Sequence, residues 1–404
     1  MRLPRSWGCY LILTTLSLQQ GTQLSLLAPL LDERGYAPVL IGALVSAISV
    51  ASLVARMPAG LFYRGDQARR LQAIAIPLLA VLLFLHPLAP DPLSLLAIRI
   101  VDGLLYGMAT TINQARFIDE QPLGPGRARA MGYYVANIAI GYSIASLLVG
   151  YLVEWAGFVV AFGAGAALQL LGLVGLLDRT PMVATSSAGA AAERFTSPGV
   201  ARPRVALSKQ AVQAWQLLAA PTLLVALFEG LLLNAQWAFW NAWLPLYTLA
   251  VGIGLAQTGV IRTVYGICNA AARLGTGDFV ARLGAGRLVF LSLVVQSLLL
   301  MLLPAVPSMA PLLVIFVIMG ALRALGIVAN TVAVIEEGEA LRMGRGPQVG
   351  LLNTVTDVGL LAGPALGGLV AERAGSIQLF VVWPLGMLAC YLVVLGASRL
   401  ATAR

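Results

Sequence analysis

The sequence predicts an all-α membrane protein with twelve transmembrane helices arranged as two pseudo-symmetric bundles of six. Three observations predict this fold: the composition, the spacing of the apolar runs and an internal repeat. Of the 404 residues, 59% are hydrophobic and only 11% are charged. A soluble domain carries about 25% charged residues. A chain this apolar therefore needs a surface that faces lipid.

Twelve apolar runs divide the chain, and each is long enough to cross a hydrocarbon core about 30 Å thick as a helix. They lie at residues 7–30, 38–63, 71–87, 93–115, 131–153, 157–177, 216–249, 255–278, 288–304, 311–335, 348–370 and 377–397. Turn-forming residues separate them, as at Gly124, Pro125 and Gly126. The breaks near 154–157 and 371–376 are short, which predicts a tight helical hairpin at each.

The segment at 179–214 differs in composition from the runs, because it is rich in serine, alanine, proline and arginine. It predicts a flexible linker between an N-terminal bundle at 1–178 and a C-terminal bundle at 215–404. Residues 205–215 are typical of a short amphipathic helix at the membrane surface. Basic residues crowd the linker side, whereas only Arg34 and Arg373 fall on the other side. This asymmetry predicts an inner-membrane protein with both termini and the linker in the cytoplasm.

The two halves of the chain repeat each other. With an offset of 217 residues, Gly42 aligns with Gly259 and Asn113 with Asn330. With an offset of 218 beyond the fourth run, further pairs align: Gly141 and Gly359, Gly150 and Gly368, Glu154 and Glu372, and Gly157 and Gly375. A parallel six-plus-six repeat is how one large class of secondary transporters is built, with the substrate site between the halves.

The sequence contains no motif or charge pattern typical of nucleic-acid-binding proteins or enzymes. The net charge of +9 is scattered between apolar runs and forms no basic stripe, so we expect no nucleic-acid partner. The sequence has no histidine cluster, HExxH, GxSxG or phosphate-binding loop, which predicts no enzyme activity, cofactor or metal. The single histidine, His86, ends an apolar run and is expected at the membrane interface.

The loop after the second run carries a family pattern. It contains Gly60, Asp66, Arg69 and Arg70, and the matching loop in the second half contains Gly277, Arg282 and Gly284. On this pattern the chain resembles the major facilitator superfamily over nearly its whole length, although Arg64 and Ala281 stand where the family has aspartate. The resemblance implies that these residues gate the two halves. A basic loop that only sets the topology is the alternative.

The fourth run carries a second pattern, in which Leu95, Arg99, Asp102 and Gly103 are similar to the Leu-x-x-x-Arg-x-x-Gln-Gly pattern of proton-coupled efflux members. The resemblance implies a role in proton coupling for Arg99 and Asp102. The alternative is a structural pair one helical turn apart that holds this helix against a neighbour. A glycine-rich stretch at 359–368 resembles an antiporter pattern, and close helix packing explains it as well.

Ionisable residues inside the apolar runs predict the functional site, because burying charge in a membrane is costly. At 1.5 Å of rise per residue, Asp102, Glu229, Arg323 and Asp357 fall in the middle layer. With Arg99, they are the candidates for proton coupling. We expect Glu229 to carry the proton, because Arg323 faces it from another helix and their distance can change as a cavity opens.

The resemblance places the central cavity between the first, fourth, seventh and tenth helices. Polar and aromatic residues on the first, fourth and seventh runs are the candidate substrate ligands: Gln19, Gln23, Tyr106, Asn113, Asn234, Gln236, Trp237, Trp240 and Asn241. A cavity with both charges, amides and tryptophans suits an amphipathic organic solute of moderate size. We therefore expect a monomeric transporter whose partners are this small molecule, protons and the lipid bilayer.

Proton-coupled export by alternating access is the function that these patterns favour. Proton-linked uptake of a metabolite, such as a sugar or an organic acid, is the nearest alternative. A channel and a membrane receptor or scaffold without transport are alternatives from other classes. A channel would carry flux without saturation or coupling, and a scaffold would carry none.

Overall fold

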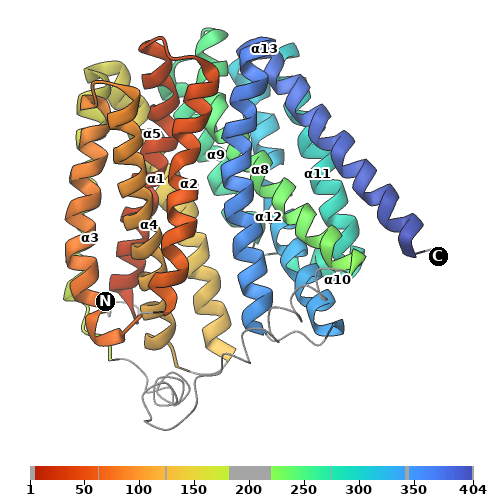
Figure 1. Ribbon diagram of the computed structural model, residues 1–404, viewed down its shortest axis with the longest axis horizontal. Coiled ribbons are helices and arrows are strands. Elements are labelled where there is room, and N and C mark those ends of the chain that lie inside the picture. The colour runs from red at the N-terminus through yellow and green to blue at the C-terminus, as the bar shows by residue number, and fades with distance from the viewer. Residues whose placement is uncertain are drawn as a thin grey trace.

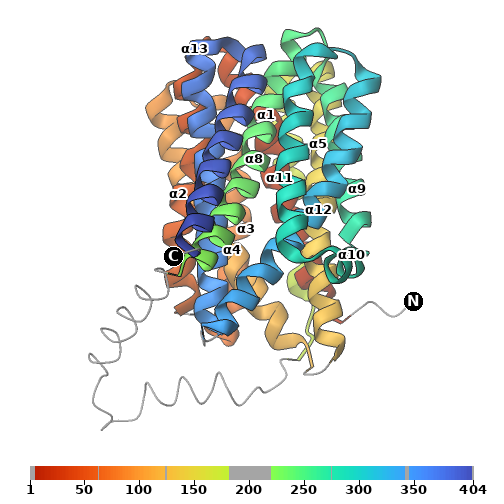
Figure 2. The ribbon, with the colours of Figure 1, turned by 90° about the vertical axis from the view of Figure 1, so that its right-hand side faces the viewer.

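The computed structural model describes residues 5–61, 63–122, 125–181, 220–273, 275–341 and 345–402, and nearly all of these are helical. The expected linker at 179–214 lies outside the described residues except for 179–181, and so does its predicted amphipathic end at 205–215. We call residues 5–181 the first part and residues 220–402 the second part. The end of the molecule at which α4 ends and α5 begins, the lower end in Figure 2, is called the linker end, and the opposite end the distal end.

The first part, red to yellow-green in Figure 1, consists of long helices that run side by side in more than one layer. Its elements are α1 (Trp7–Glu33), α2 (Pro38–Leu61), α3 (Gly65–Leu85), the 3₁₀-helix η1 (His86–Leu88), α4 (Pro92–Glu120), α5 (Pro125–Leu170) and the 3₁₀-helix η2 (Leu171–Leu177). The sequence determines some of these ends directly. The Asp91 carboxylate caps α4 by accepting hydrogen bonds of 2.9 Å from the backbone N–H groups of Leu93 and Ser94, and Pro92 occupies the first turn.

The second part, green to blue in Figure 1, stands beside the first. Its elements are α8 (Pro221–Ala250), α9 (Leu255–Arg273), α10 (Thr276–Leu283), α11 (Ala285–Leu302), the 3₁₀-helix η3 (Leu303–Ala305), α12 (Met309–Ala340) and α13 (Arg345–Thr402). Eight described segments are long and apolar enough to cross a membrane. Twelve spans in two bundles of six remain a prediction, because α1 and α9 are not among these eight.

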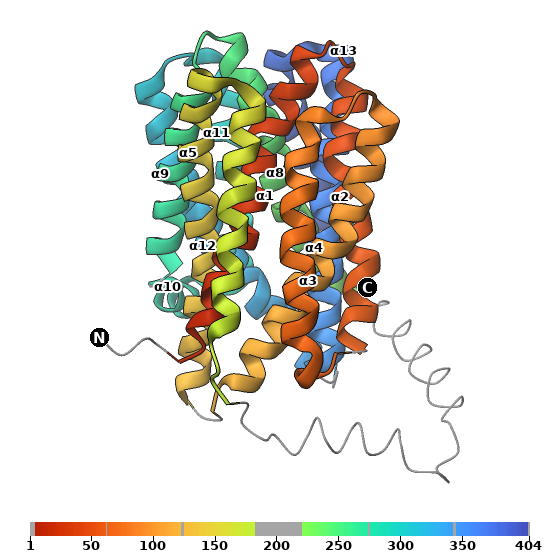
Figure 3. The same ribbon diagram turned by 90° about the vertical axis from the view of Figure 1, so that its left-hand side faces the viewer.

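Two helices are twice as long as a membrane crossing requires, and a glycine divides each of them. Gly157 in α5 and Gly375 in α13 both have a φ of +79°, which side-chain-bearing residues rarely adopt. The two glycines are 218 residues apart, as the repeat predicts. The yellow and yellow-green arms of α5 stand next to each other in Figure 3. The hairpin breaks predicted near 154–157 and 371–376 are therefore found at these glycines.

The two parts pack against each other through glycines at equivalent positions. A Cβ atom built on Gly42 in α2 would lie 3.1 Å from the Cα atom of Gly368 in α13. A Cβ atom built on Gly150 in α5 would lie 3.1 Å from the Cα atom of Ala256 in α9. Side chains at Gly42 and Gly150 would therefore push the helices apart, so glycine is required for this close approach.

A carboxylate accompanies each of these crossings at the distal end. Glu154 of α5 accepts a hydrogen bond of 3.0 Å from the backbone N–H of Ala256, at the start of α9. Glu372 of α13 accepts one of 3.5 Å from the backbone N–H of Val39, at the start of α2. Each carboxylate thus caps a helix N-terminus of the other part, where the helix dipole favours negative charge.

Candidate functional site

A central cavity of about 600 Å³ lies between the two parts. It reaches from the middle of the molecule toward the linker end, because Arg273, the last residue of α9, and Asn353, near the start of α13, both line it. Its polar lining also includes Asn234, Trp237, Trp240, Asn241, Arg262, Asn269, Arg323 and Asn330. Of the described residues that line the cavity, three are arginines and none is acidic.

Arg262 of α9 joins the two parts at the cavity wall. Its guanidinium donates to the Ser25 hydroxyl at 2.7 Å and to the Leu24 carbonyl at 3.0 Å, both on α1. It also donates to the backbone carbonyl of Asn241 on α8. The Nε atom of Arg262 is buried and has no hydrogen-bond partner in the part of the chain that the structure describes. Neutral oxygens hold this side chain in place and leave its charge uncompensated.

Arg323 lies on α12 and is positioned in a similar way. One Nη atom donates to the Leu233 carbonyl at 2.6 Å and the other to the Asn234 side-chain oxygen at 2.7 Å. Its guanidinium carbon is 5.9 Å from the ring centroid of Trp237, within range of a cation–π contact. Only 8% of this residue is exposed. Two fixed cations therefore border a cavity that also presents indole rings and amides.

A small interface pocket of about 90 Å³ adjoins the central cavity and shares Tyr142 and Trp237 with it. Arg56 of α2 lines this pocket, and its Nη1 atom is 3.2 Å from Oδ1 of Asp357 on α13. Asp357 is buried, and neither of its oxygens accepts a hydrogen bond from a described residue. A single ion pair between the two parts therefore holds this buried carboxylate.

Comparisons with known proteins agree with this architecture. The family model described as Major Facilitator Superfamily matches residues 9–346. The chain belongs to the major facilitator superfamily. It is a membrane transporter and not an enzyme.

Solved transporter structures share the fold. The nucleoside transporter NupG superposes with a TM-score of 0.76 at 16% identity, over 98% of this chain and 99% of that one. A bacterial homologue of the human lysosomal transporter Spinster, in an inward-facing and unoccupied conformation, gives a TM-score of 0.66 at 13% identity, over 97% and 94%. Among curated proteins, none matches this chain. At these identities the likeness concerns the fold alone.

The candidate substrate ligands separate into several places in this transporter. Asn234, Trp237, Trp240 and Asn241 of α8 line the central cavity together with Arg323. Tyr106 lines the interface pocket. Gln236 points away from both and donates to the Ser297 hydroxyl at 2.9 Å. The seventh run therefore contributes four of its five candidate ligands to the cavity wall, and the fifth, Gln236, lies elsewhere.

Gln19 and Gln23 of α1 belong to a buried cluster inside the first part. Their amide nitrogens donate to the two oxygens of Asp102 at 2.7 and 2.6 Å. Arg99 donates to the carbonyls of Leu44 and Val45 and to Gln23, and its Nη1 atom is 4.0 Å from Asp102. Arg99 thus connects α4 to α2. This agrees with the alternative interpretation, in which Arg99 and Asp102 are a structural pair that holds α4 against a neighbouring helix. None of the four residues lines the central cavity.

His86 belongs to the same cluster, which sequence reasoning missed. It is completely buried among the helices of the first part, whereas its depth in the membrane remains a prediction. Its Nε2 atom is 4.0 Å from an Asp102 oxygen, and its Nδ1 atom is 2.8 Å from the Leu82 carbonyl. The ring also stacks on Phe162 with 5.9 Å between centroids. A lone histidine at the end of an apolar run carries no signal that could have identified these neighbours.

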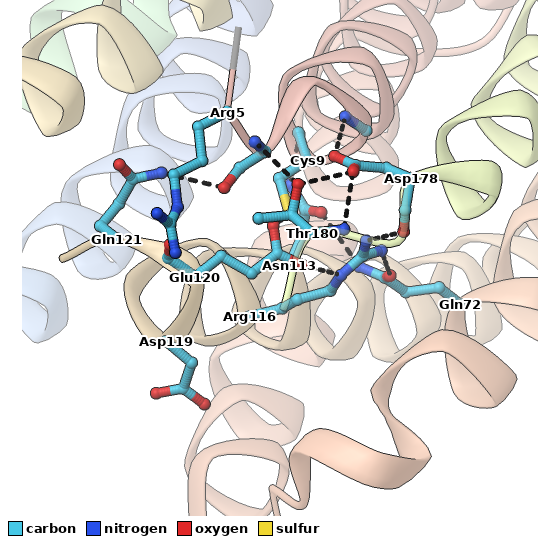
Figure 4. A network of polar contacts seen from close by, with 12 residues as sticks. Arg5, Cys9, Gln72, Asn113, Arg116, Asp119, Glu120, Gln121, Asp178 and Thr180 are labelled. Atoms are coloured by element: carbon cyan, nitrogen blue, oxygen red, sulfur yellow. Dashed lines mark hydrogen bonds and ion pairs between the residues drawn. The ribbon is translucent and has the colours of Figure 1, made fainter. Parts of the chain in front are cut away.

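Asn113 lies in a polar network at the linker end of the first part, shown in Figure 4. Its amide nitrogen donates to the Cys9 carbonyl and to the Tyr134 hydroxyl, both at 2.9 Å, and its oxygen accepts from Gln72 at 3.0 Å. These contacts connect α1, α3, α4 and α5. Asn113 does not line the central cavity. Asn113 therefore holds helices of the first part together, and it does not border the cavity in which a contact with substrate was expected.

Glu229 does not face Arg323, contrary to our expectation. Its Oε1 atom accepts a hydrogen bond of 2.6 Å from the Tyr391 hydroxyl on α13. It lines a separate pocket that shares no described residue with the central cavity. The physical reason is the neighbouring helix: α13 packs against α8, and its Tyr391 hydroxyl holds the Glu229 carboxylate in the pocket between these helices. A role of Glu229 in coupling remains a prediction without the partner that suggested it.

The predicted gate residues lie at the linker end. Asp66, Arg69 and Arg70 are in the first turns of α3, directly after the loop that follows Gly60 in α2. In the second part, Gly277 and Arg282 lie in the short helix α10, and Gly284 ends it. The φ of Gly284 is +81°, so this turn requires glycine. Whether these loops gate the halves remains a prediction.

Proposed function

We propose that the transporter moves an organic anion of moderate size together with a proton by alternating access. The observation that supports this best is the charge of the central cavity: three arginines and no acidic residue among its described lining. A buried guanidinium without a carboxylate partner favours a ligand that brings the negative charge. The organic acid of the uptake alternative therefore fits better than a cationic or neutral exported compound.

The remaining residues of the cavity wall determine which anions would fit. Trp237 and Trp240 offer indole rings to an apolar or aromatic body, and five asparagines offer hydrogen bonds to polar substituents. NupG is named a nucleoside transporter, and a ring carrying polar groups is compatible with such a lining. The arginines add the requirement for a carboxylate or phosphate on that ring.

Coupling requires a carboxylate whose environment changes as the two parts move. Asp357 and Arg56 meet this requirement, because they lie on opposite parts. Their 3.2 Å contact spans the interface and would break if the two parts separated. Protonation of Asp357 would release the charge of Arg56 beside Tyr142 and Trp237, where a substrate anion can use it. In this mechanism a proton and an anion favour each other's binding, which is symport. Export by exchange for a proton is the alternative.

A ligand-binding experiment tests the substrate class first. Indole-3-acetate and indole-3-acetamide have nearly the same shape and differ in charge. The melting temperature of the purified chain should rise when the acid is added and should not rise with the amide, because only a bound ligand adds stability. Arg323→Gln should remove the response to the acid. A larger shift with the amide than with the acid would contradict the anion proposal.

A flux experiment tests the coupling pair, using whichever anion stabilises the protein. In proteoliposomes, the wild type should accumulate that anion when the outside is acidic. Asp357→Asn should still exchange labelled for unlabelled anion but should lose accumulation. Glu229→Gln, a matched change in another buried carboxylate, should keep both activities. Accumulation that survives Asp357→Asn but not Glu229→Gln would reassign the proton to Glu229. Proton entry coupled to loss of the anion from the vesicle would indicate export.

A further inference from the structure

A second pocket, of about 780 Å³, lies within the second part of the chain at the linker end. Its wall is formed by α8, α11, α12 and the last turns of α13, from Thr222 at one helix end to Ser398 at another. In Figure 1 the dark-blue end of α13 diverges from the neighbouring helices toward the linker end. This pocket shares no described lining residue with the central cavity, so it needs a separate explanation.

Glu229 is the buried charge of this pocket. Only 5% of the residue is exposed, and Tyr391 donates a 2.6 Å hydrogen bond to Oε1. The other oxygen, Oε2, accepts no hydrogen bond from a described residue. A carboxylate in such a place is costly unless a positive group or further donors compensate it. Among the described residues, the Tyr391 hydroxyl supplies the donor to this carboxylate, which leaves room for a second donor that comes from a ligand.

The rest of the lining favours a cation with an apolar body. Two further carboxylates, Glu336 and Glu337, line the pocket against one basic residue, Arg287. Three acidic residues and one basic residue make this region acidic in a chain whose net charge is +9. Most of the remaining wall is apolar, including Phe290, Leu291 and Leu395. A carboxylate at a buried position in an apolar wall matches an amphipathic amine.

At the corresponding place in the first part, the described helices come into close contact. In the first part, Gly8 and Gly175 bring α1 and η2 together, and a Cβ atom on Gly175 would lie 2.6 Å from the Gly8 carbonyl oxygen. Offsets of 217 and 218 place Val225 and Val393 at the corresponding positions in the second part. Val225 lines the pocket, whereas Val393 is exposed and does not. The second part therefore lacks the pair of glycines that permits the close approach in the first part.

We propose that this pocket binds an amphipathic organic cation whose ammonium group pairs with Glu229. The apolar body of the ligand packs against Phe290, Leu291 and Leu395, and Glu336 and Glu337 attract it at the linker end. This site is distinct from the anion cavity and takes the opposite charge. Its occupation would wedge α13 away from α8, so such a cation would also act on the helices that form the cavity wall.

The test uses monodansylcadaverine, a fluorescent primary amine that is protonated at pH 7, and its uncharged N-acetyl derivative. Titration of the purified full chain should give tighter binding of the amine by at least about tenfold, the difference expected for one buried charge-assisted hydrogen bond. Glu229→Gln should abolish this preference while keeping the Tyr391 contact and the melting temperature. Ala333→Phe, which fills the pocket from α12, should weaken both ligands.

Two outcomes would overturn the proposal. One is equal affinity for the amine and its acetylated form in the wild-type protein. The other is a preference for the amine that survives Glu229→Gln and disappears with Trp237→Ala, which would place the ligand in the central cavity. The response to indole-3-acetate reports on the central cavity alone, so failure of the anion proposal remains separable from failure of this one.

Discussion

The linker ends of the two parts are built from corresponding positions but are closed to different degrees. In the first part, Asn113 donates to the Cys9 carbonyl at 2.9 Å, and in the second part Asn330 donates to the Ala226 carbonyl at 2.7 Å. The offset of 217 relates both donors and both acceptors. Around this shared contact, the first part adds the polar network of Figure 4, whereas the second part leaves a pocket of about 780 Å³.

A few substitutions account for the difference. Arg116 in the first part donates to Glu120 at 2.8 Å and to the Asp178 carbonyl at 3.2 Å, and the corresponding residue in the second part is Ala333. Ile12 is packed and apolar, and its counterpart is Glu229. In the first part, Arg116 and Glu120 therefore lie in a closed cluster. In the second part, the buried carboxylate of Glu229 lies in an open pocket. We therefore expect the loss of a charged side chain to cost more stability in the first part than in the second.

The largest expected effect comes from Arg116→Met, which breaks the closed cluster. Arg116 and Glu120 are 2% and 1% exposed, so the variant leaves a buried carboxylate without its cation. Removing one partner of such a pair costs about 3–5 kcal/mol. We expect a large fall in the melting temperature, measured by thermal unfolding in detergent.

Two controls sharpen this first prediction. The double variant Arg116→Met with Glu120→Leu should recover most of the loss, because no lone charge remains buried. Arg287→Met, which changes an exposed arginine at the open pocket of the second part, should alter stability by less than about 0.5 kcal/mol. Equal losses for Arg116→Met and Arg287→Met would show that the two linker ends do not differ as described.

Much of the fold could be predicted from the sequence, because depth along a helix follows from counting residues. The offset of 217 to 218 correctly related Gly157 to Gly375, which have the same φ. It also paired Gly42 with Gly259 and Gly150 with Gly368, and the structure shows that these four glycines lie at the contacts between the parts. These features depend on chain length and on residues whose backbone geometry is restrictive.

The candidate site could be predicted only in part, because the direction of a side chain depends on how its helix is rotated against its neighbours. Asn234, Trp237, Trp240 and Asn241 line the cavity as expected. Glu229, which was expected to face Arg323, points into another pocket. Asp357 was one of the candidates for proton coupling, yet its partner Arg56 lies 301 positions earlier in the chain, a pairing that one sequence does not reveal.

A smaller effect is expected from Asp178, which closes the first part beside α1. Burial by itself raises the pKa of this carboxyl, but hydrogen bonds from Thr180 and from the backbone N–H of Gly8 bring it below its ordinary value of 3.8. A pKa that is lower in the folded state means that the carboxylate stabilises the fold above about pH 4, and this contribution is lost as the pH falls through the folded value.

Asp178→Asn should therefore cost about 0.5–2 kcal/mol at pH 7, the range for losing an acceptor at a helix N-terminus. The difference in melting temperature between wild type and variant should shrink as the pH is lowered from 7 to 3. The second part has Gly396 at the corresponding position and so lacks such a carboxylate. A difference that stays constant over this range would contradict the assigned role of the ionised group.

The smallest effects are expected at the distal end, where the two parts are most alike. Glu154 and Glu372 each cap a helix of the other part, at 3.0 and 3.5 Å. An anion at an exposed helix N-terminus contributes about 0.3–1 kcal/mol. Glu154→Gln should therefore favour separation of the parts by about two- to fivefold, and Glu372→Gln by less, because its contact is longer. Spin labels at Pro90→Cys and Pro307→Cys, in a chain with its native cysteines replaced by alanine, would report the separated population. If neither variant raises that population, the glycine contacts of Gly42 and Gly150 close the distal end without the carboxylates.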